Sequence, residues 1–301
     1  MADDRVRVDE FAIDAALVGR LLAGQFPQWA DRPLRRVASA GTDNAIYRLG
    51  ADMCLRLPRR PEAVDQVVKE CRWLPALAPL PLAVPKPLGR GAPAEGYPWP
   101  WAVYSWIEGE TATLDRLDDP LEAAATLARF ITALQAIDAT GGPPSGPQNH
   151  FRGVPLAQMD GRTRRAIASL AGEIDVQTAG AVWEAALAAP SWAAAPVWVH
   201  GDIQSGNLLA RDGRIAAVID LGLLGVGDPA CDLTVAWMLL PAEARRAFRA
   251  ALAVDDATWM RGRGWALYAG VIALDYYRES NPSLSGMCRR AIAEVLADFP
   301  A

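Results

Sequence analysis

A short stretch in the second half of the chain groups side chains that are suited to acid–base and metal chemistry. His200, Asp202 and Asn207 occur together in HGDIQSGN, and Asp220 follows the β-prone run IAAVI. A turn at residues 212–213 is expected to fold these two runs into a hairpin, which returns Asp220 to the end that holds Asp202. At that end a carboxylate and an amide can hold Mg2+, and a second carboxylate can orient a nucleophile.

Each of these residues also has an ordinary structural explanation. His200 could be a buried histidine with satisfied hydrogen bonds, Asn207 a turn residue and Asp220 a helix cap. The ordered combination favours the functional interpretation, because H-x-D-x4-N followed by an apolar strand and D-x-G is the pattern of kinase-like phosphotransferases. In those enzymes the first motif is the catalytic loop and the second binds the metal.

The residues within these motifs resemble those of the aminoglycoside phosphotransferase family more than those of the protein kinases. The resemblance rests on His-Gly-Asp and on the segment GDPACDL at 227–233, and it is sharpest from Val199 to Trp237. It implies that Asp202 is the catalytic base and that His200 organises the loop. It also implies that Asn207 and Asp220 are the Mg2+ ligands.

Two nearby features differ in their expected importance. The family commonly has a second His and a Pro where this chain has Gln204 and Ser205, a difference that affects the geometry of the loop rather than the base or the ligands. Asp228 and Asp232 are expected to have structural roles, as helix caps or as supports of the catalytic loop.

The pattern along the chain predicts two lobes. Residues 1–107 contain short β-prone runs separated by turns, and residues 108–301 are mainly helical around the embedded hairpin. The predicted fold class is α+β, with a small antiparallel β N-lobe and a larger, mainly helical C-lobe that carries the hairpin. By the family resemblance, the N-lobe binds nucleotide and the C-lobe holds the catalytic hairpin and the acceptor site. The family resemblance implies the two-lobed protein-kinase-like fold.

Nucleotide binding of the Walker type is excluded, because Lys69 and Lys86 are the only lysines and neither follows a glycine. By resemblance, the loop with Gly41, Thr42 and Asn44 covers the phosphates, although a plain β-turn would look the same.

The resemblance also predicts the groups that hold the rest of the nucleotide. Arg56 takes the place of the phosphate-binding lysine on the third strand, paired with Glu70 of the next helix; a surface salt bridge explains the two residues equally well. Backbone groups of Ser105 and Ile107 are expected to bind adenine in the segment between the lobes.

The acceptor site is the least defined part of the sequence. Asp275, Tyr276 and Glu279, in ALDYYRES, are candidates for binding a polar or cationic acceptor, and residues 149–153 are a second candidate. A solvent-exposed helix face explains the first group equally well.

Composition restricts the class of partner. The 301 residues carry 30 Lys+Arg and 35 Asp+Glu, for a net charge of −5, and lack basic runs, which argues against nucleic-acid and membrane partners. Four dispersed cysteines form no CxxC pair, which argues against a zinc or redox motif. The N-terminal residues lack the apolar core of a signal peptide, so a cytoplasmic location is expected.

The sequence therefore predicts a kinase that uses ATP or GTP with Mg2+ and transfers the γ-phosphoryl group to a hydroxyl of a small molecule. An aminoglycoside and a metabolic acceptor such as an amino alcohol both remain open, because the chain from residue 150 onward has nearly balanced charges, 16 acidic residues against 14 arginines. A nucleotide-binding pseudokinase is the main alternative, motivated by Arg56. A two-metal phosphoesterase is disfavoured, since His150 and His200 are the only histidines.

Overall fold

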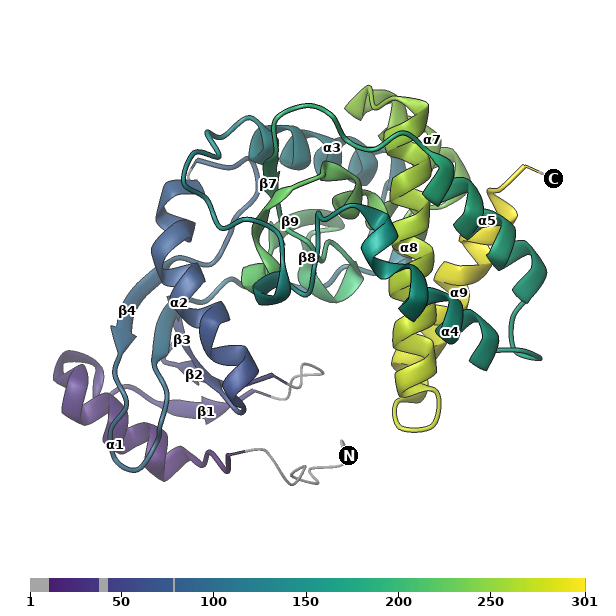
Figure 1. Cartoon of the computed structure of the whole chain (residues 1–301). Helices are drawn as coiled ribbons and strands as arrows, with labels where there is room; N and C mark the ends of the chain where they lie inside the picture. Colours follow the sequence, from purple (N-terminus) through teal and green to yellow (C-terminus); the bar gives the residue numbers. More distant parts are fainter. Residues whose placement is uncertain (1–10, 38–42, 78, 301) are drawn as a thin grey trace. The chain divides into compact units, whose positions relative to one another are not determined.

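The computed structural model describes residues 11–37, 43–77 and 79–300. The chain divides into two compact units (Figure 1). The first comprises the described residues up to Pro79 together with Val84–Glu108, and the second comprises Leu80–Ala83 and the chain from Gly109 onward. The mixed architecture, a small antiparallel sheet in one unit and mostly helices in the other, confirms the predicted fold class.

The first unit is built on a five-stranded antiparallel sheet with the order β1-β2-β3-β5-β4. Its strands are β1 (Leu34–Arg36), β2 (Asn44–Leu49), β3 (Met53–Pro58), β4 (Pro87–Gly91) and β5 (Trp101–Ser105), and its helices are α1 (Ala15–Gln25) and α2 (Val64–Trp73). Alternate residues of the inner strands, such as Leu55, Leu57 and Val103, are buried in the same core as Val18 and Leu21 of α1. Burial of this apolar face provides most of the free energy that holds helix and sheet together.

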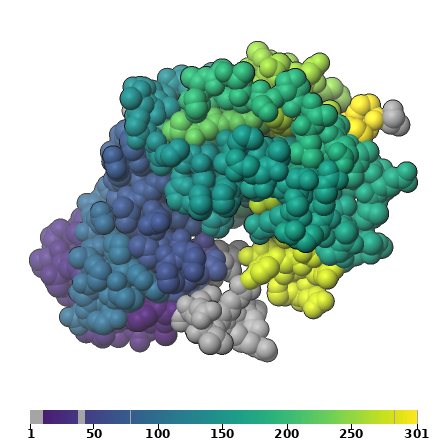
Figure 2. Space-filling view, viewed as in Figure 1, coloured from purple at the N-terminus to yellow at the C-terminus, as the bar shows by residue number. Residues whose placement is uncertain are grey.

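The second unit is mainly helical and contains two small sheets, with orders β6-β8-β9 and β10-β7. Its helices are α3 (Pro120–Gln135), α4 (Asp160–Ser169), α5 (Val176–Ala188), α6 (Val235–Met238), α7 (Ala242–Leu252), α8 (Asp256–Tyr277) and α9 (Pro282–Ala297). Its strands are β6 (Glu110–Thr111), β7 (Val197–Val199), β8 (Leu208–Arg211), β9 (Arg214–Val218) and β10 (Gly225–Gly227). The long helix α8 packs against α4, α5 and α9 (Figure 1). In the space-filling view, the visible face of this unit is formed mainly by its teal and green segments (Figure 2).

The predicted hairpin is confirmed as β8 and β9. Asp212 and Gly213 both have positive φ, 52° and 72°, which is the backbone of the two-residue turn that matches the twist of antiparallel strands. Leu208 pairs with Val218, so the residues just outside this pair, Asn207 and Ile219, lie at the same end of the hairpin.

The boundary between the units differs from the predicted lobe boundary at two places. Glu108, which was expected in the C-lobe, belongs to the first unit, and Leu80–Ala83 belongs to the second. The reason for the second difference is backbone pairing: the carbonyl of Ala83 accepts a hydrogen bond from the N–H of Val218 at 2.9 Å, which adds the segment to the edge of β9. Among the helices of the described ranges, none is both long enough and apolar enough to cross a bilayer.

Candidate active site

The loop that follows β7 is held in shape by a buried carboxylate. Asp232, in the 3-10 segment Pro229–Thr234, accepts hydrogen bonds from the backbone N–H of His200 at 2.8 Å and of Gly201 at 2.7 Å. Complete burial raises the pKa of the Asp232 carboxyl, while the two N–H groups and His200 oppose that rise. The expected structural role of Asp232 is confirmed as support of this loop.

The ring of His200 connects the loop to the strand before Asp220. Its Nδ1 accepts from the backbone N–H of Asp202 at 3.2 Å, and its Nε2 lies 3.1 Å from the carbonyl oxygen of Ile219. Because Nδ1 is the acceptor, the proton must be on Nε2, which then donates to Ile219. The ring is fully buried, so His200 acts through the position of its neighbours rather than by contact with solvent.

Asp202 and Asn207 are in direct contact. The Asn207 amide nitrogen donates to the Asp202 carboxylate at 2.8 Å and to the Asp202 carbonyl at 2.9 Å. The Asn207 carbonyl accepts from the N–H of Ile219 at 2.9 Å, which joins this pair to the residue before Asp220. The amide nitrogen is thereby engaged, so Oδ1 is the atom that Asn207 can offer to a ligand.

Asp220 lies just before the 3-10 turn Leu221–Leu223 in a left-handed backbone conformation, with φ 59° and ψ 65°. Its side chain is exposed and does not make a capping hydrogen bond to that turn. The helix-cap explanation of Asp220 is therefore wrong. A non-glycine residue in the left-handed conformation costs conformational free energy. Such residues are more common at functional positions than elsewhere.

In the first unit, Arg56 and Glu70 form a largely buried ion pair. Arg56 Nη1 lies 2.8 Å from Glu70 Oε1, and the two side chains are only 12% and 2% exposed. Gln66 accepts from Arg56 at 3.4 Å, and the Tyr104 hydroxyl donates to Glu70 at 2.8 Å. The alternative of a surface salt bridge is therefore wrong, because Glu70 is buried, Arg56 is largely buried, and both make further hydrogen bonds.

The start of β2 joins the same cluster. With its amide oxygen directed at Arg56, Asn44 accepts from Nε and Nη2 at 3.1 Å each. Asp43, one residue earlier, forms an ion pair with Arg60 and accepts from Gln66 at 3.3 Å. The predicted phosphate-loop residues Gly41 and Thr42 lie outside the described residues.

The predicted adenine-binding segment begins at the end of β5. The backbone N–H of Ser105 donates to the carbonyl of Lys86 at 2.8 Å, and its hydroxyl accepts from the Lys86 N–H at 2.9 Å. The N–H of Ser105 is thus engaged within the first unit. Ile107, two residues further on, is half-buried.

The predicted acceptor residues lie at the C-terminal end of α8. Asp275 accepts a hydrogen bond from the Ser169 hydroxyl at 2.6 Å, which ties it to the end of α4. Tyr276 and Glu279 are exposed. The second candidate segment is organised by Asn149, whose fully buried side chain accepts from the N–H of Gly146 and donates to the carbonyl of Arg152.

Comparison with known proteins identifies the family. The sequence pattern of the phosphotransferase enzyme family matches residues 35–298. The chain belongs to this family. An aminoglycoside 3'-phosphotransferase of Escherichia coli is 41% identical over 63 residues, which are 21% of this chain and only 23% of that relative's length.

Solved structures resemble this phosphotransferase over nearly its whole length. The GDP and kanamycin complex of APH(2'')-IIIa has a TM-score of 0.73 at 18% identity, over 94% of this chain and 99% of the other. The apoenzyme of macrolide 2'-phosphotransferase MphH from Brachybacterium faecium has a TM-score of 0.59 at 25% identity, over 96% and 100% of the two chains. These likenesses establish the shared fold.

The oxygen atoms at the hairpin end suit Mg2+ better than a transition metal. Within the described ranges, no group of three or more His, Cys, Asp or Glu side chains is arranged to hold a metal ion. A carboxylate and an amide oxygen are hard ligands, and Mg2+ is commonly held by one or two such groups with water and substrate phosphates completing the shell. Asn207 and Asp220 therefore fit the ion that the phosphotransferase fold implies.

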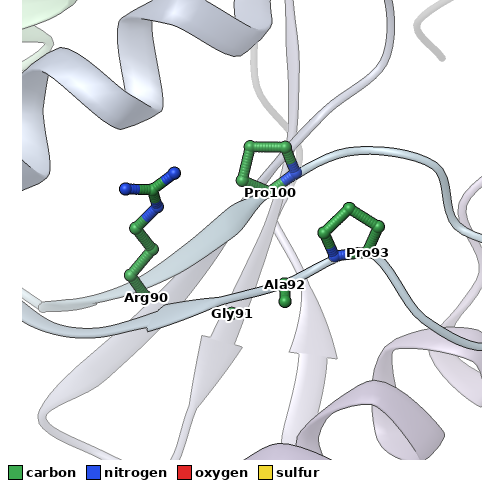
Figure 3. A pocket seen from close by; sticks show the side chains of 5 residues that line it. All are labelled: Arg90, Gly91, Ala92, Pro93 and Pro100. Carbon is green, nitrogen blue, oxygen red and sulfur yellow. The ribbon is translucent and has the colours of Figure 1, made fainter.

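Several supporting residues were not identified from the sequence. Gln66 and Tyr104 complete the Arg56–Glu70 cluster; the spacing of Gln66 and Glu70, one helical turn apart, was an available signal for the first of them. A surface hollow at the β4–β5 hairpin is lined by Arg90, Gly91, Ala92, Pro93 and Pro100 (Figure 3). None of the predicted site residues lines this hollow.

Proposed function

We propose that this phosphotransferase transfers the γ-phosphoryl group of ATP or GTP to a hydroxyl group of a small molecule. The observation that carries the proposal is the contact between Asp202 and Asn207 within a loop anchored by Asp232. A base and a metal ligand held together in this way supply the positioning and charge neutralisation on which phosphoryl transfer mainly depends.

Asp202 aligns the acceptor hydroxyl and takes its proton as the oxygen attacks the γ-phosphorus. The hydrogen bond from Asn207 orients this carboxylate, and the His200 ring holds the backbone of Asp202 next to the β9 end. Asn207 Oδ1 and the Asp220 carboxylate would hold Mg2+, which neutralises charge on the phosphates when it is bound.

The nucleotide is assigned to groups of the first unit. Arg56, fixed by Glu70 and Gln66, steadies the α- and β-phosphates. Because the N–H of Ser105 is engaged by Lys86, the proposed adenine contacts are the carbonyl of Ser105 and the N–H of Ile107. Structures of relatives named as GDP and ADP complexes support a nucleoside triphosphate as donor and leave the choice between ATP and GTP to experiment.

Substitution of Asp202 by Asn tests the proposal. We expect the rate of phosphoryl transfer, or of triphosphate hydrolysis when water is the only acceptor, to fall by about 10^3-fold, since a positioned base contributes about 10^2–10^4. Nucleotide affinity, measured by calorimetric titration, should change by no more than about twofold because catalysis rather than ground-state binding is removed.

Asp212→Asn is the matched control. Asp212 carries the same charge at the exposed turn of the same hairpin, and Asn is well suited to its left-handed conformation. Equal activity of Asp202→Asn and the control would reject the mechanism. Nucleotide binding by the unsubstituted protein without any turnover would identify a pseudokinase instead.

A further inference from the structure

Arg152 packs against the catalytic loop one residue before the proposed base. Gly201 has φ +83°, and a Cβ atom placed on it would lie 3.0 Å from Cβ and 3.1 Å from Cγ of Arg152. The stem of the arginine therefore lies in close contact with the backbone that leads into Asp202. Because Gly201 directly precedes Asp202, Arg152 contacts the loop within one residue of the proposed base.

Two buried rings of α8 hold the guanidinium group. Its central carbon lies 5.3 Å from the ring centroid of Tyr268 and 5.7 Å from that of Trp265. The rings are perpendicular to each other, with centroids 5.5 Å apart, and both side chains are buried. Cation–π contacts on two rings restrict the guanidinium group, so less conformational entropy is lost when it binds a ligand.

The charge of Arg152 is not balanced by a carboxylate. Among the described residues, Arg152 has no ion-pair partner, and its Nη1 atom is buried without a hydrogen-bond acceptor. Trp265, which contacts Arg152, has a second buried donor: its Nε1 atom has no acceptor among the described residues. Buried N–H groups that lack acceptors are costly, so such donors at a functional loop point to an acceptor supplied by a ligand.

The buried arginines of this unit are paired with carboxylates, in contrast to the half-buried Arg152. Arg261 binds Asp228 at 2.8 Å, and Arg245 binds both Glu294 and Asp298. These pairs also leave Asp228 unavailable to Arg152. Asp232 is engaged by the two backbone N–H groups of the catalytic loop.

We propose that Arg152 binds an oxyanion group of the acceptor, so that the acceptor is a hydroxyl compound that also carries a carboxylate or a phosphate. This inference rests on the proposed phosphotransferase function and names its substrate class. The planar guanidinium matches carboxylate and phosphate oxygens in a two-pronged geometry. The same fixed positive charge opposes binding of a polycationic acceptor beside Asp202.

The position of Arg152 also changes the assignment of the acceptor residues on α8. Tyr268, which contacts Arg152, lies seven residues before Asp275, or about 10 Å along the helix axis. Asp275, near the C-terminal end of α8, accepts a hydrogen bond from Ser169 of α4. Arg152, a cation, therefore contacts both α8 and the catalytic loop, whereas Asp275 lies further along the helix.

Binding of four small probes, measured by calorimetric titration without nucleotide, tests the charge preference independently of turnover. The probes are small hydroxyl compounds that differ in charge. Glycerate and glycerol 3-phosphate are anions, glycerol is neutral and ethanolamine is a cation. We expect glycerate or glycerol 3-phosphate to bind at least tenfold more tightly than glycerol and ethanolamine. The stronger of the two identifies the oxyanion as carboxylate or phosphate.

Three variants assign the preference to Arg152. Arg152→Met should abolish the tenfold preference, Arg152→Lys should retain part of it because the charge remains without the planar fork, and Arg162→Met should leave it unchanged. Arg162 is exposed on α4 and provides the same loss of charge away from the loop. Thermal melting of each variant separates loss of binding from loss of folding.

Equal affinity for all four probes, or the same preference in folded Arg152→Met, would overturn the proposal. Once a turned-over acceptor is known, Arg152→Met should lower kcat/KM at least tenfold for the acid and by no more than twofold for its methyl ester. An equal loss for acid and ester would instead assign Arg152 to the transferred phosphoryl group. The Asp202→Asn result is independent of these outcomes, so failure of the inference and failure of the proposed function are distinguishable.

Discussion

Arg56 in the first unit lies 2.8 Å from Glu70, whereas Asp202 in the second unit has no cationic partner among the described residues. Neutral side chains contact both groups: Gln66 accepts a hydrogen bond from Arg56 and Tyr104 donates one to Glu70, and Asn207 donates one to Asp202. The difference is in the balance of charge. The neutralised pair joins α2 to the sheet, while the Asp202 carboxylate leaves a negative potential beside the proposed Mg2+ ligands Asn207 and Asp220, and this potential attracts a cation.

Breaking the ion pair of the first unit should have the largest effect on folding. Arg56→Met leaves Glu70 buried without its cation, and we expect the free energy of unfolding to fall by about 3–5 kcal/mol. Denaturant titration measures the loss, with Arg35→Met at an exposed position of β1 as the control. Similar stabilities of the two variants would show that the pair does not support the fold.

Removing the charge of Asp220 should affect catalysis rather than folding. We expect Asp220→Asn to lower kcat about 100-fold, roughly 2.7 kcal/mol in the activation free energy, and to raise the Mg2+ concentration needed for half-maximal rate. Because the side chain is exposed, the free energy of unfolding should change by less than about 0.5 kcal/mol. Steady-state rates over a Mg2+ series test this, and an unchanged Mg2+ dependence would remove Asp220 from the metal site.

Asp232 combines the two kinds of behaviour, since it is a buried acid that supports the catalytic loop. In Asp232→Asn one amide oxygen remains for two backbone donors, and the amide nitrogen faces an N–H group. We expect a loss of about 1–3 kcal/mol in the free energy of unfolding. Hydrogen exchange should accelerate at the amides of His200 and Gly201, and unchanged exchange there would contradict the anchoring role.

The smallest expected effect concerns Lys69, which is buried on α2 beside Glu70. Burial lowers the pKa of Lys69 to about 8, so in the pH range above 8 the folded protein binds fewer protons than the unfolded chain. Stability then increases as the pH rises from 8 toward 10.5, and the contribution of Lys69 between pH 7 and 9 is about 1 kcal/mol. Lys69→Met should remove this rise, which denaturant titrations at the two pH values measure with Lys86→Met as the control.

Local patterns predicted a large part of the fold and of the candidate site. Alternation of apolar residues and the Asp-Gly turn determine the β8–β9 hairpin and its register, because a two-residue turn leaves little choice of pairing. The Arg56–Glu70 pair was predicted from the family resemblance, which relates a residue of the third strand to a glutamate of the next helix. Two alternatives were wrong: a surface location for this pair and a helix-cap role for Asp220. Both depended on burial and on backbone geometry, which a sequence pattern does not contain.

The sequence by itself determined the order and spacing of His200, Asp202, Asn207 and Asp220, because the hairpin that brings them to one end is a local structure. Only the tertiary structure decided which distant groups support or extend that site. Asp232 reaches the loop from 30 residues beyond Asp202, Ala83 pairs with β9 from another part of the chain, and Arg152 meets Trp265 and Tyr268 across more than 100 residues. Such contacts depend on how separate elements pack, and packing follows from the summed burial of many side chains rather than from any short motif.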